Sequence, residues 1–122
     1  ISGVAPECSL FGSISSAGLV DQDRPTLLVG GDRDELTTMD DQVRPIYQGI
    51  SGDPKHLAVI EDTGHFTYSV MCALTANANG CEDDFTPVEQ VHPLTNELVL
   101  AFLGQQRGFP AELPEDPLLT WE

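Results

Sequence analysis

The chain has 122 residues, of which 40% are hydrophobic, so it can pack one domain and is not a disordered acidic tail. Its 20 Asp and Glu against 5 Lys and Arg give a net charge of −15, which argues against nucleic acid as a partner. No apolar run approaches the ~20 residues that span a bilayer, so we predict no membrane span. No basic segment followed by a hydrophobic stretch opens the chain, which predicts a signal peptide that is absent or already removed.

The first part of the chain contains two stretches with the character of buried strands. Residues 1–5 predict a short buried strand that ends at Pro6, and this abrupt start on core-like residues leads us to expect that the chain begins inside a domain. Residues 26–29 follow Pro25, which lacks an N–H and therefore fits the first position of a strand. This run is apolar or β-branched throughout, as is typical of a parallel strand buried on both faces.

A helix and another strand follow. Thr37 or Thr38 can cap the helix. Its predicted buried face repeats at helical spacing through Val43, Ile46, Tyr47 and Ile50. Pro45 lies inside this helix and predicts an irregular early part. Residues 55–60 are rich in apolar side chains and predict the next strand.

The last part of the chain predicts two more helices and a tail. One helix covers residues 66–74, and the other covers residues 97–106, capped by Thr95 or the asparagine after it. The chain therefore divides into a domain, residues 1–107, and an acidic tail, residues 108–122, that we expect to lie extended over the surface. The order of elements predicts an α/β fold with a mostly parallel sheet flanked by helices.

Two acidic residues and a histidine follow neighbouring predicted strands. Asp32 and Asp34 come directly after the first of these strands, and His65 follows the second. Because ligands bind at the carboxyl ends of strands in open α/β sheets, we expect a carboxylate and the imidazole to meet there. Asp34 is the predicted partner of His65, with Asp32 as the alternative.

These residues carry a resemblance to a known family. The order strand, Gly31-Asp32-Arg33-Asp34, helix, strand, Gly64-His65 resembles the closing half of the α/β-hydrolase fold, whose triad order is Ser, Asp or Glu, His. Ala5-Pro6, the run from Arg24 to Gly31, residues 55–60 and Gly64-His65-Phe66 resemble cutinase-like polyester hydrolases. Bacterial relatives of dienelactone hydrolase and platelet-activating-factor acetylhydrolase share the layout. The resemblance covers roughly residues 1–103 and implies a C-terminal half that is incomplete without an N-terminal half.

The resemblance implies a serine-type carboxylic ester hydrolase of lipase, cutinase or acetylhydrolase type. His65 would be the general base and Asp34 the triad acid, while Phe66 would line a substrate-binding pocket. No Gly-x-Ser-x-Gly occurs in the sequence. The nucleophile is therefore expected in a preceding N-terminal segment, and this chain alone is expected to be inactive on its ester or lipid substrate. Glu7 stands where polyester hydrolases place an aromatic residue, which argues against a polymer substrate.

Two alternatives stay open. The nucleophile can be cysteine, as in dienelactone hydrolases, or aspartate, as in dehalogenases. The chain can also be a non-catalytic acidic binding domain on the same scaffold, because a fold does not determine a function.

The cysteines and histidines indicate where the protein works and whether it binds a metal or a cofactor. Cys72 and Cys81 are nine positions apart, and we favour a disulfide between them over two reduced thiols. Such a bridge predicts a secreted or periplasmic location, with Cys8 left without a partner in this chain. The three histidines have no zinc-ligand spacing, and we predict neither a metal nor a cofactor.

Overall fold

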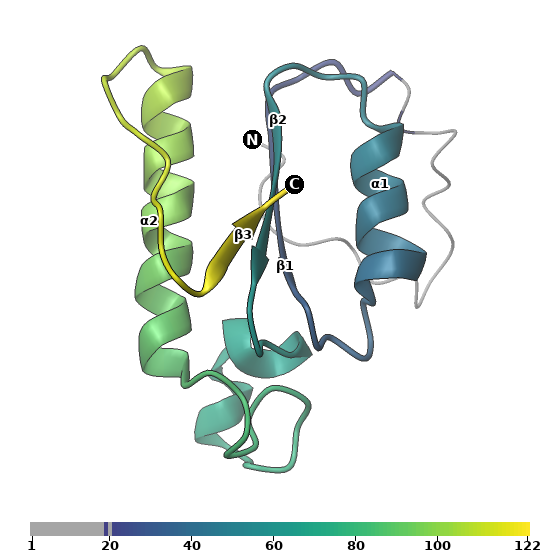
Figure 1. Cartoon of the computed structure of the whole chain (residues 1–122), viewed down its shortest axis with the longest axis vertical. Coiled ribbons are helices and arrows are strands. Elements are labelled where there is room, and N and C mark those ends of the chain that lie inside the picture. Colours follow the sequence, from purple (N-terminus) through teal and green to yellow (C-terminus); the bar gives the residue numbers. More distant parts are fainter. Residues whose placement is uncertain (1–18, 20) are drawn as a thin grey trace.

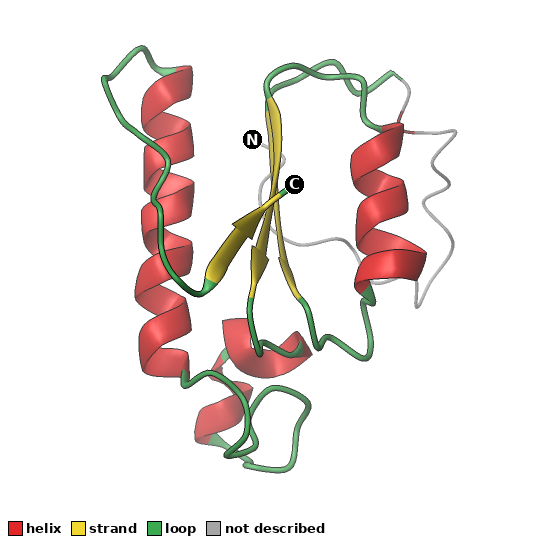
Figure 2. Ribbon diagram, in the orientation of Figure 1, coloured by secondary structure: helices red, strands yellow, loops and turns green. Residues whose placement is uncertain are grey.

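A computed structural model describes residues 19 and 21–122 and shows a three-stranded mixed sheet between helices, an α/β arrangement (Figure 1). The strands are β1 (Thr26–Gly31), β2 (Lys55–Ile60) and β3 (Leu119–Trp121), in the order β1-β2-β3. Helix α1 (Arg44–Gly49) covers one face of the sheet, and helix α2 (Val88–Gln106) covers the other (Figure 2). The strand predicted over residues 1–5 and the residues Glu7 and Cys8 lie outside the described part.

The register of the sheet places two loops side by side. β1 runs parallel to β2, with Thr26 opposite Lys55 and Gly31 opposite Ile60. Both strands therefore end at one edge, which we call the rim, and the short helices after β2 lie there (Figure 2). β3 is antiparallel to β2, so the sheet is mixed and not purely parallel.

Successive side chains of the strands point to opposite faces and build two cores. On the α1 side, Leu28 of β1 joins Leu57 and Val59 of β2 in a cluster with Met39, Val43 and Ile50. On the α2 side, Leu27 joins Ala58 and Ile60 in a cluster with Val91, Leu94, Leu98 and Phe102. Because both faces of β1 and β2 are covered, these strands carry the near-continuous apolar runs that made them recognisable.

The helix after β1 begins irregularly, as Pro45 predicted. A π-helical turn, Met39–Val43, precedes α1, and the proline occupies the first turn of α1, where its missing N–H costs little. Thr38 precedes the π-helical turn, and its side chain makes no capping hydrogen bond there.

Two predicted helices differ from those observed. Residues 66–74 form two 3₁₀ turns, His65–Tyr68 and Val70–Ala73, rather than one α-helix. α2 begins at Val88 and continues through Pro93, whereas the cap signal predicted a start near residue 97. Burial of Val91 and Leu94 in the core on both sides of the proline explains why the helix continues.

The tail is also different from the prediction. Residues 108–122 do not only lie over the surface, because Leu119–Trp121 add β3 to the outer edge of β2. The backbone N–H of Glu61 donates to Leu118 O at 2.8 Å, and that of Glu122 donates to Leu57 O at 3.0 Å. The tail therefore covers one edge of β2.

Candidate functional site

The Asp34 loop, residues 32–38, and the His65 loop, residues 61–66, lie against each other at the rim. The N–H of Arg33 donates to Thr63 O at 3.1 Å. A Cβ added to Gly31 would lie 2.2 Å from that same carbonyl oxygen, so only glycine permits this approach. The register of β1 and β2 and this close contact together bring the two loops within side-chain reach.

The structure brings Asp34 and His65 together. Asp34 Oδ2 lies 3.0 Å from His65 Nδ1. The other carboxylate oxygen, Oδ1, accepts from the N–H of Leu36 at 2.8 Å and of Thr37 at 2.7 Å. Both side chains are largely buried, with 9% of Asp34 and 24% of His65 exposed. The carboxylate is thus fixed on one side by backbone N–H groups and presents its second oxygen to the imidazole.

Asp32 has a different partner. Its Oδ1 accepts from the N–H of Thr63 at 3.3 Å, which ties the Asp34 loop to the start of the His65 loop. Asp34 is therefore the carboxylate in hydrogen-bond distance of His65, and Asp32 supports the loops. Thr37 adds a second oxygen near the ring, with its Oγ1 3.4 Å from His65 Nδ1.

A cavity of about 700 Å³ opens beside the pair. Asp34 and His65 form part of its wall, and the apolar part comes from Val29, Val43, Val99 and Leu100. Phe66 does not line this cavity. Its ring packs edge-on against the His65 imidazole, with centroids 5.0 Å apart and planes at 87°. The sequence predicts Phe66 in a substrate pocket, and this stays a prediction, while the structure shows its ring against the His65 imidazole.

Two cavity residues were not singled out by the sequence as site residues. Tyr68, three positions after His65, is partly buried, and this desolvation together with the charges of Asp34 and Asp32 raises its pKa. His92 donates from Nε2 to Thr67 O at 2.7 Å, which anchors α2 to the His65–Tyr68 turn. The spacing of Tyr68 from His65 is a signal that sequence reasoning could have used, whereas no local pattern links His92 to the rim.

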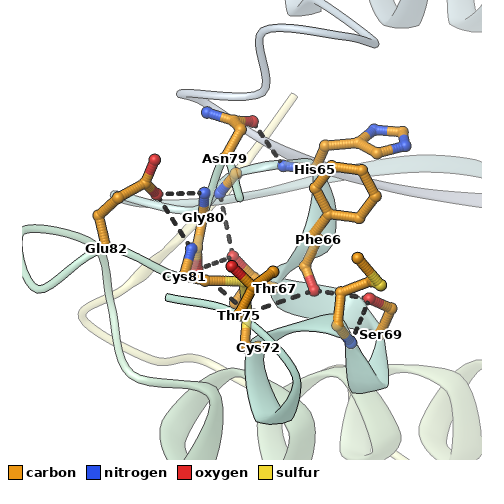
Figure 3. Close-up of a disulfide and its surroundings, with 12 residues drawn as sticks. His65, Phe66, Thr67, Ser69, Cys72, Thr75, Asn79, Gly80, Cys81 and Glu82 are labelled. Carbon is orange, nitrogen blue, oxygen red and sulfur yellow. Dashed lines mark hydrogen bonds between the residues drawn. A yellow bond between two sulfur atoms is a disulfide. The ribbon is translucent and has the colours of Figure 1, made fainter. Parts of the chain in front are cut away.

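The predicted cysteine pair is present as a disulfide between Cys72 and Cys81. It closes the disulfide loop, residues 72–81, which follows the turn that begins at His65 (Figure 3). Within residues 19 and 21–122, no three metal-binding side chains gather into a site for an ion. No helix among these residues is long and apolar enough to cross a membrane.

Comparison with known proteins identifies no relative of this chain. No protein-family model, no curated protein and no solved structure matches the chain.

Proposed function

We propose that this chain supplies the acid and the base of a serine-type carboxylic ester hydrolase with an α/β-hydrolase fold. The observation that carries the proposal is the 3.0 Å contact between Asp34 Oδ2 and His65 Nδ1, at the shared end of two parallel strands and beside an apolar cavity. Triads of this kind are recognised by the geometry and the chemical roles of their members.

Each of the two residues has a separate task in this chemistry. A serine hydroxyl is a weak nucleophile until an imidazole takes its proton. His65 Nε2 would accept that proton during attack on the ester carbonyl and return it to the leaving alcohol. Asp34 would hold the proton on Nδ1, fixing the tautomer, and would stabilise the imidazolium. In the second half of the reaction, His65 would take a proton from water, which attacks the acyl-enzyme. The carboxylic acid product would then leave and the serine would be regenerated.

The serine and the N–H groups that stabilise the oxyanion are proposed to come from an N-terminal half of the same hydrolase, outside this chain. The apolar wall of the cavity favours an ester with an apolar acyl or alcohol group, such as a lipid. The disulfide supports an extracellular or periplasmic site of action.

Joining the chain to its N-terminal half tests the proposal. The complete protein should hydrolyse p-nitrophenyl esters and react with a fluorophosphonate probe, and His65→Ala should abolish hydrolysis. His56→Ala is the matched control, because His56 lies in β2 and its ring packs against Phe102 and Trp121. The 122-residue chain alone should show no turnover.

Three outcomes would redirect the assignment. Ester hydrolysis by the isolated chain that depends on His65 would overturn the split site. Activity without fluorophosphonate labelling would point to a cysteine or aspartate nucleophile. A complete protein that neither reacts nor hydrolyses would leave a binding domain on the hydrolase scaffold.

A further inference from the structure

The side chain of Asn79 lies between the two loops of the rim. Its Oδ1 accepts from the N–H of His65 at 2.8 Å and from the N–H of Glu35 at 3.2 Å. Its Nδ2 donates to Arg33 O at 3.2 Å. One amide group therefore contacts the residues on both sides of Asp34 and the backbone of His65, and Figure 3 shows it directed at His65.

Asn79 is itself held by the disulfide loop. Its carbonyl oxygen accepts from the N–H of Phe66 at 2.9 Å. The next residue, Gly80, has a φ of +96° and approaches Gly64 so closely that a Cβ on Gly64 would lie 2.5 Å from Gly80 N. Thr67 closes this contact, because its hydroxyl accepts from Gly64 N at 3.2 Å and donates to Gly80 O at 2.9 Å.

The disulfide follows directly after this contact in the chain. Cys81 is two residues beyond Asn79, and its bridge to Cys72 closes the loop that carries the asparagine (Figure 3). The Glu82 carboxylate also accepts hydrogen bonds from the N–H of Gly80 at 2.9 Å and from the N–H of Cys81 at 3.1 Å. The backbone around Asn79 is thus restrained on its C-terminal side by a covalent bond and a carboxylate.

We propose that Asn79 is a positioning residue that sets the distance between Asp34 and His65, and that the Cys72–Cys81 bridge acts on the pair through it. We call this arrangement of Asn79 and the disulfide the clamp. Its role in catalysis rests on the proposed function, but its contacts belong to this chain alone. The asparagine bonds to segments 14 and 44 to 46 positions away, so it joins parts that local structure alone would not align. Positioning of this kind matters because small displacements of catalytic groups reduce rates strongly.

Nuclear magnetic resonance on the 122-residue chain tests the clamp without any activity. In alkaline buffer the wild-type chain should show the low-field proton signal of His65 Nδ1–H bonded to Asp34. Asn79→Ala should lose or shift this signal and should speed exchange of the His65 and Glu35 amide protons about tenfold. Asn77→Ala is the matched control, since Asn77 is an exposed asparagine of the same loop. It should leave all three readouts unchanged.

A second variant separates the two halves of the clamp. Asn79→Asp keeps the oxygen that accepts from His65 and Glu35 but removes the donor to Arg33 O. The two amides should then stay protected while the signals of Arg33 and Asp34 shift. This variant also carries the test if Asn79→Ala does not fold, since full retention of the wild-type spectrum around Asp34 in Asn79→Asp would overturn the proposal.

Reduction of the disulfide is the third test of the proposal. In the wild-type chain it should reproduce the effect of Asn79→Ala on the His65 signal, and in Asn79→Ala it should add nothing to that effect. An unchanged His65 signal in Asn79→Ala refutes the clamp, whatever the enzymatic activity. A clamp that holds in a complete protein without esterase activity refutes the proposed function alone. In an active complete protein, Asn79→Ala should lower kcat on the order of 10²-fold with little change in KM.

Discussion

The rim and the C-terminal strand are held in place by different forces. At the rim, hydrogen bonds join the two loops directly and through Asn79, and the disulfide closes the loop that carries Asn79. The guanidinium of Arg33 also reaches Asp84 Oδ2 at 2.6 Å. The C-terminal segment instead adds apolar side chains to the core on the α2 side, namely Leu113, Leu118, Leu119 and Trp121.

This difference separates positioning from stability. Hydrogen bonds contribute modest net free energy but fix direction and distance, whereas burial of apolar area contributes most of the stability without fixing a single geometry. We therefore expect changes at the rim to disturb the Asp34–His65 pair more than the fold. Changes in the C-terminal segment should lower the free energy of unfolding and leave the pair intact.

The largest expected effect is that of Asp34→Asn. The amide oxygen can still accept from Leu36 and Thr37, so the loop keeps its fold, but the amide NH₂ would face His65 Nδ1 and favour the wrong tautomer. In the proposed complete hydrolase, kcat should fall by about 10⁴-fold. Steady-state hydrolysis measures the rate, and the nitrogen chemical shifts of His65 report the tautomer in this chain.

Asp32→Asn is the matched control for that change. The amide oxygen of the variant can keep the hydrogen bond from the Thr63 N–H, which holds the loops together and does not involve the imidazole. A near-normal rate for Asp34→Asn together with a large loss for Asp32→Asn would transfer the role of triad acid to Asp32.

The rim was partly accessible to sequence reasoning. β1 and β2 were recognisable because burial on both faces imposes continuous apolar runs, and parallel pairing then places Asp34 and His65 at one edge. Asn79 was not recognisable, because its role depends on a loop whose path is set by Gly80 and by contacts with Thr67. Hydrogen bonds between distant loops leave no periodic pattern in a sequence.

The C-terminal strand was missed for another reason. A strand of three residues is too short to show a clear alternation of apolar and polar side chains, and the prolines before it suggested a surface tail. Trp121 and the apolar pair before Thr120 were the available signal. The cap signal at Thr95 or the asparagine after it predicted too late a start for α2. The helix begins at Val88 instead, because core packing on both sides of Pro93 outweighs the cost of a proline inside it.

Loss of the disulfide should have the next largest effect. Although the bridge belongs to the rim, its loss should also lower the stability of the fold. In the chain-entropy account, opening a loop of this length lowers the free energy of unfolding by about 2–3 kcal/mol. Urea unfolding of Cys72→Ser/Cys81→Ser against wild type measures it, with Cys8→Ser as the control for loss of another thiol. Unchanged stability would mean that the bridge acts only on the geometry of the rim.

Trp121→Ala should destabilise the chain by about 1–2 kcal/mol, less than a fully buried tryptophan, because the side chain is only half-buried. The ring packs at the α2-side core, 6.0 Å from the His56 ring, and its Nε1–H donates to Pro114 O at 3.3 Å. The His65 Nδ1–H signal should be unchanged in the folded variant. A shift of that signal would show that the two regions are coupled.

The smallest effect is expected at Glu122, which joins the end of the tail to α1. Arg44 donates to its carboxylate at 2.8 and 2.5 Å, and this bonding lowers the pKa of Glu122. Since the folded chain binds this proton less tightly than the unfolded chain, the pair stabilises the fold above the ordinary glutamate pKa of about 4.3. That stabilisation disappears as the pH falls through the lowered value.

The pair is about one third exposed, so solvent screening limits its contribution to less than about 1 kcal/mol at neutral pH. Glu122→Gln should therefore be slightly less stable than wild type at pH 7 and equal to it in strong acid. Glu115→Gln removes the same charge from an exposed site in the tail. Because the chain carries a net charge of −15, that control should be neutral or slightly stabilising. Equal effects of both variants across the pH range of urea unfolding would show that the Arg44 contact adds nothing beyond general charge repulsion. The tail would then be held by apolar packing and by its backbone hydrogen bonds to β2.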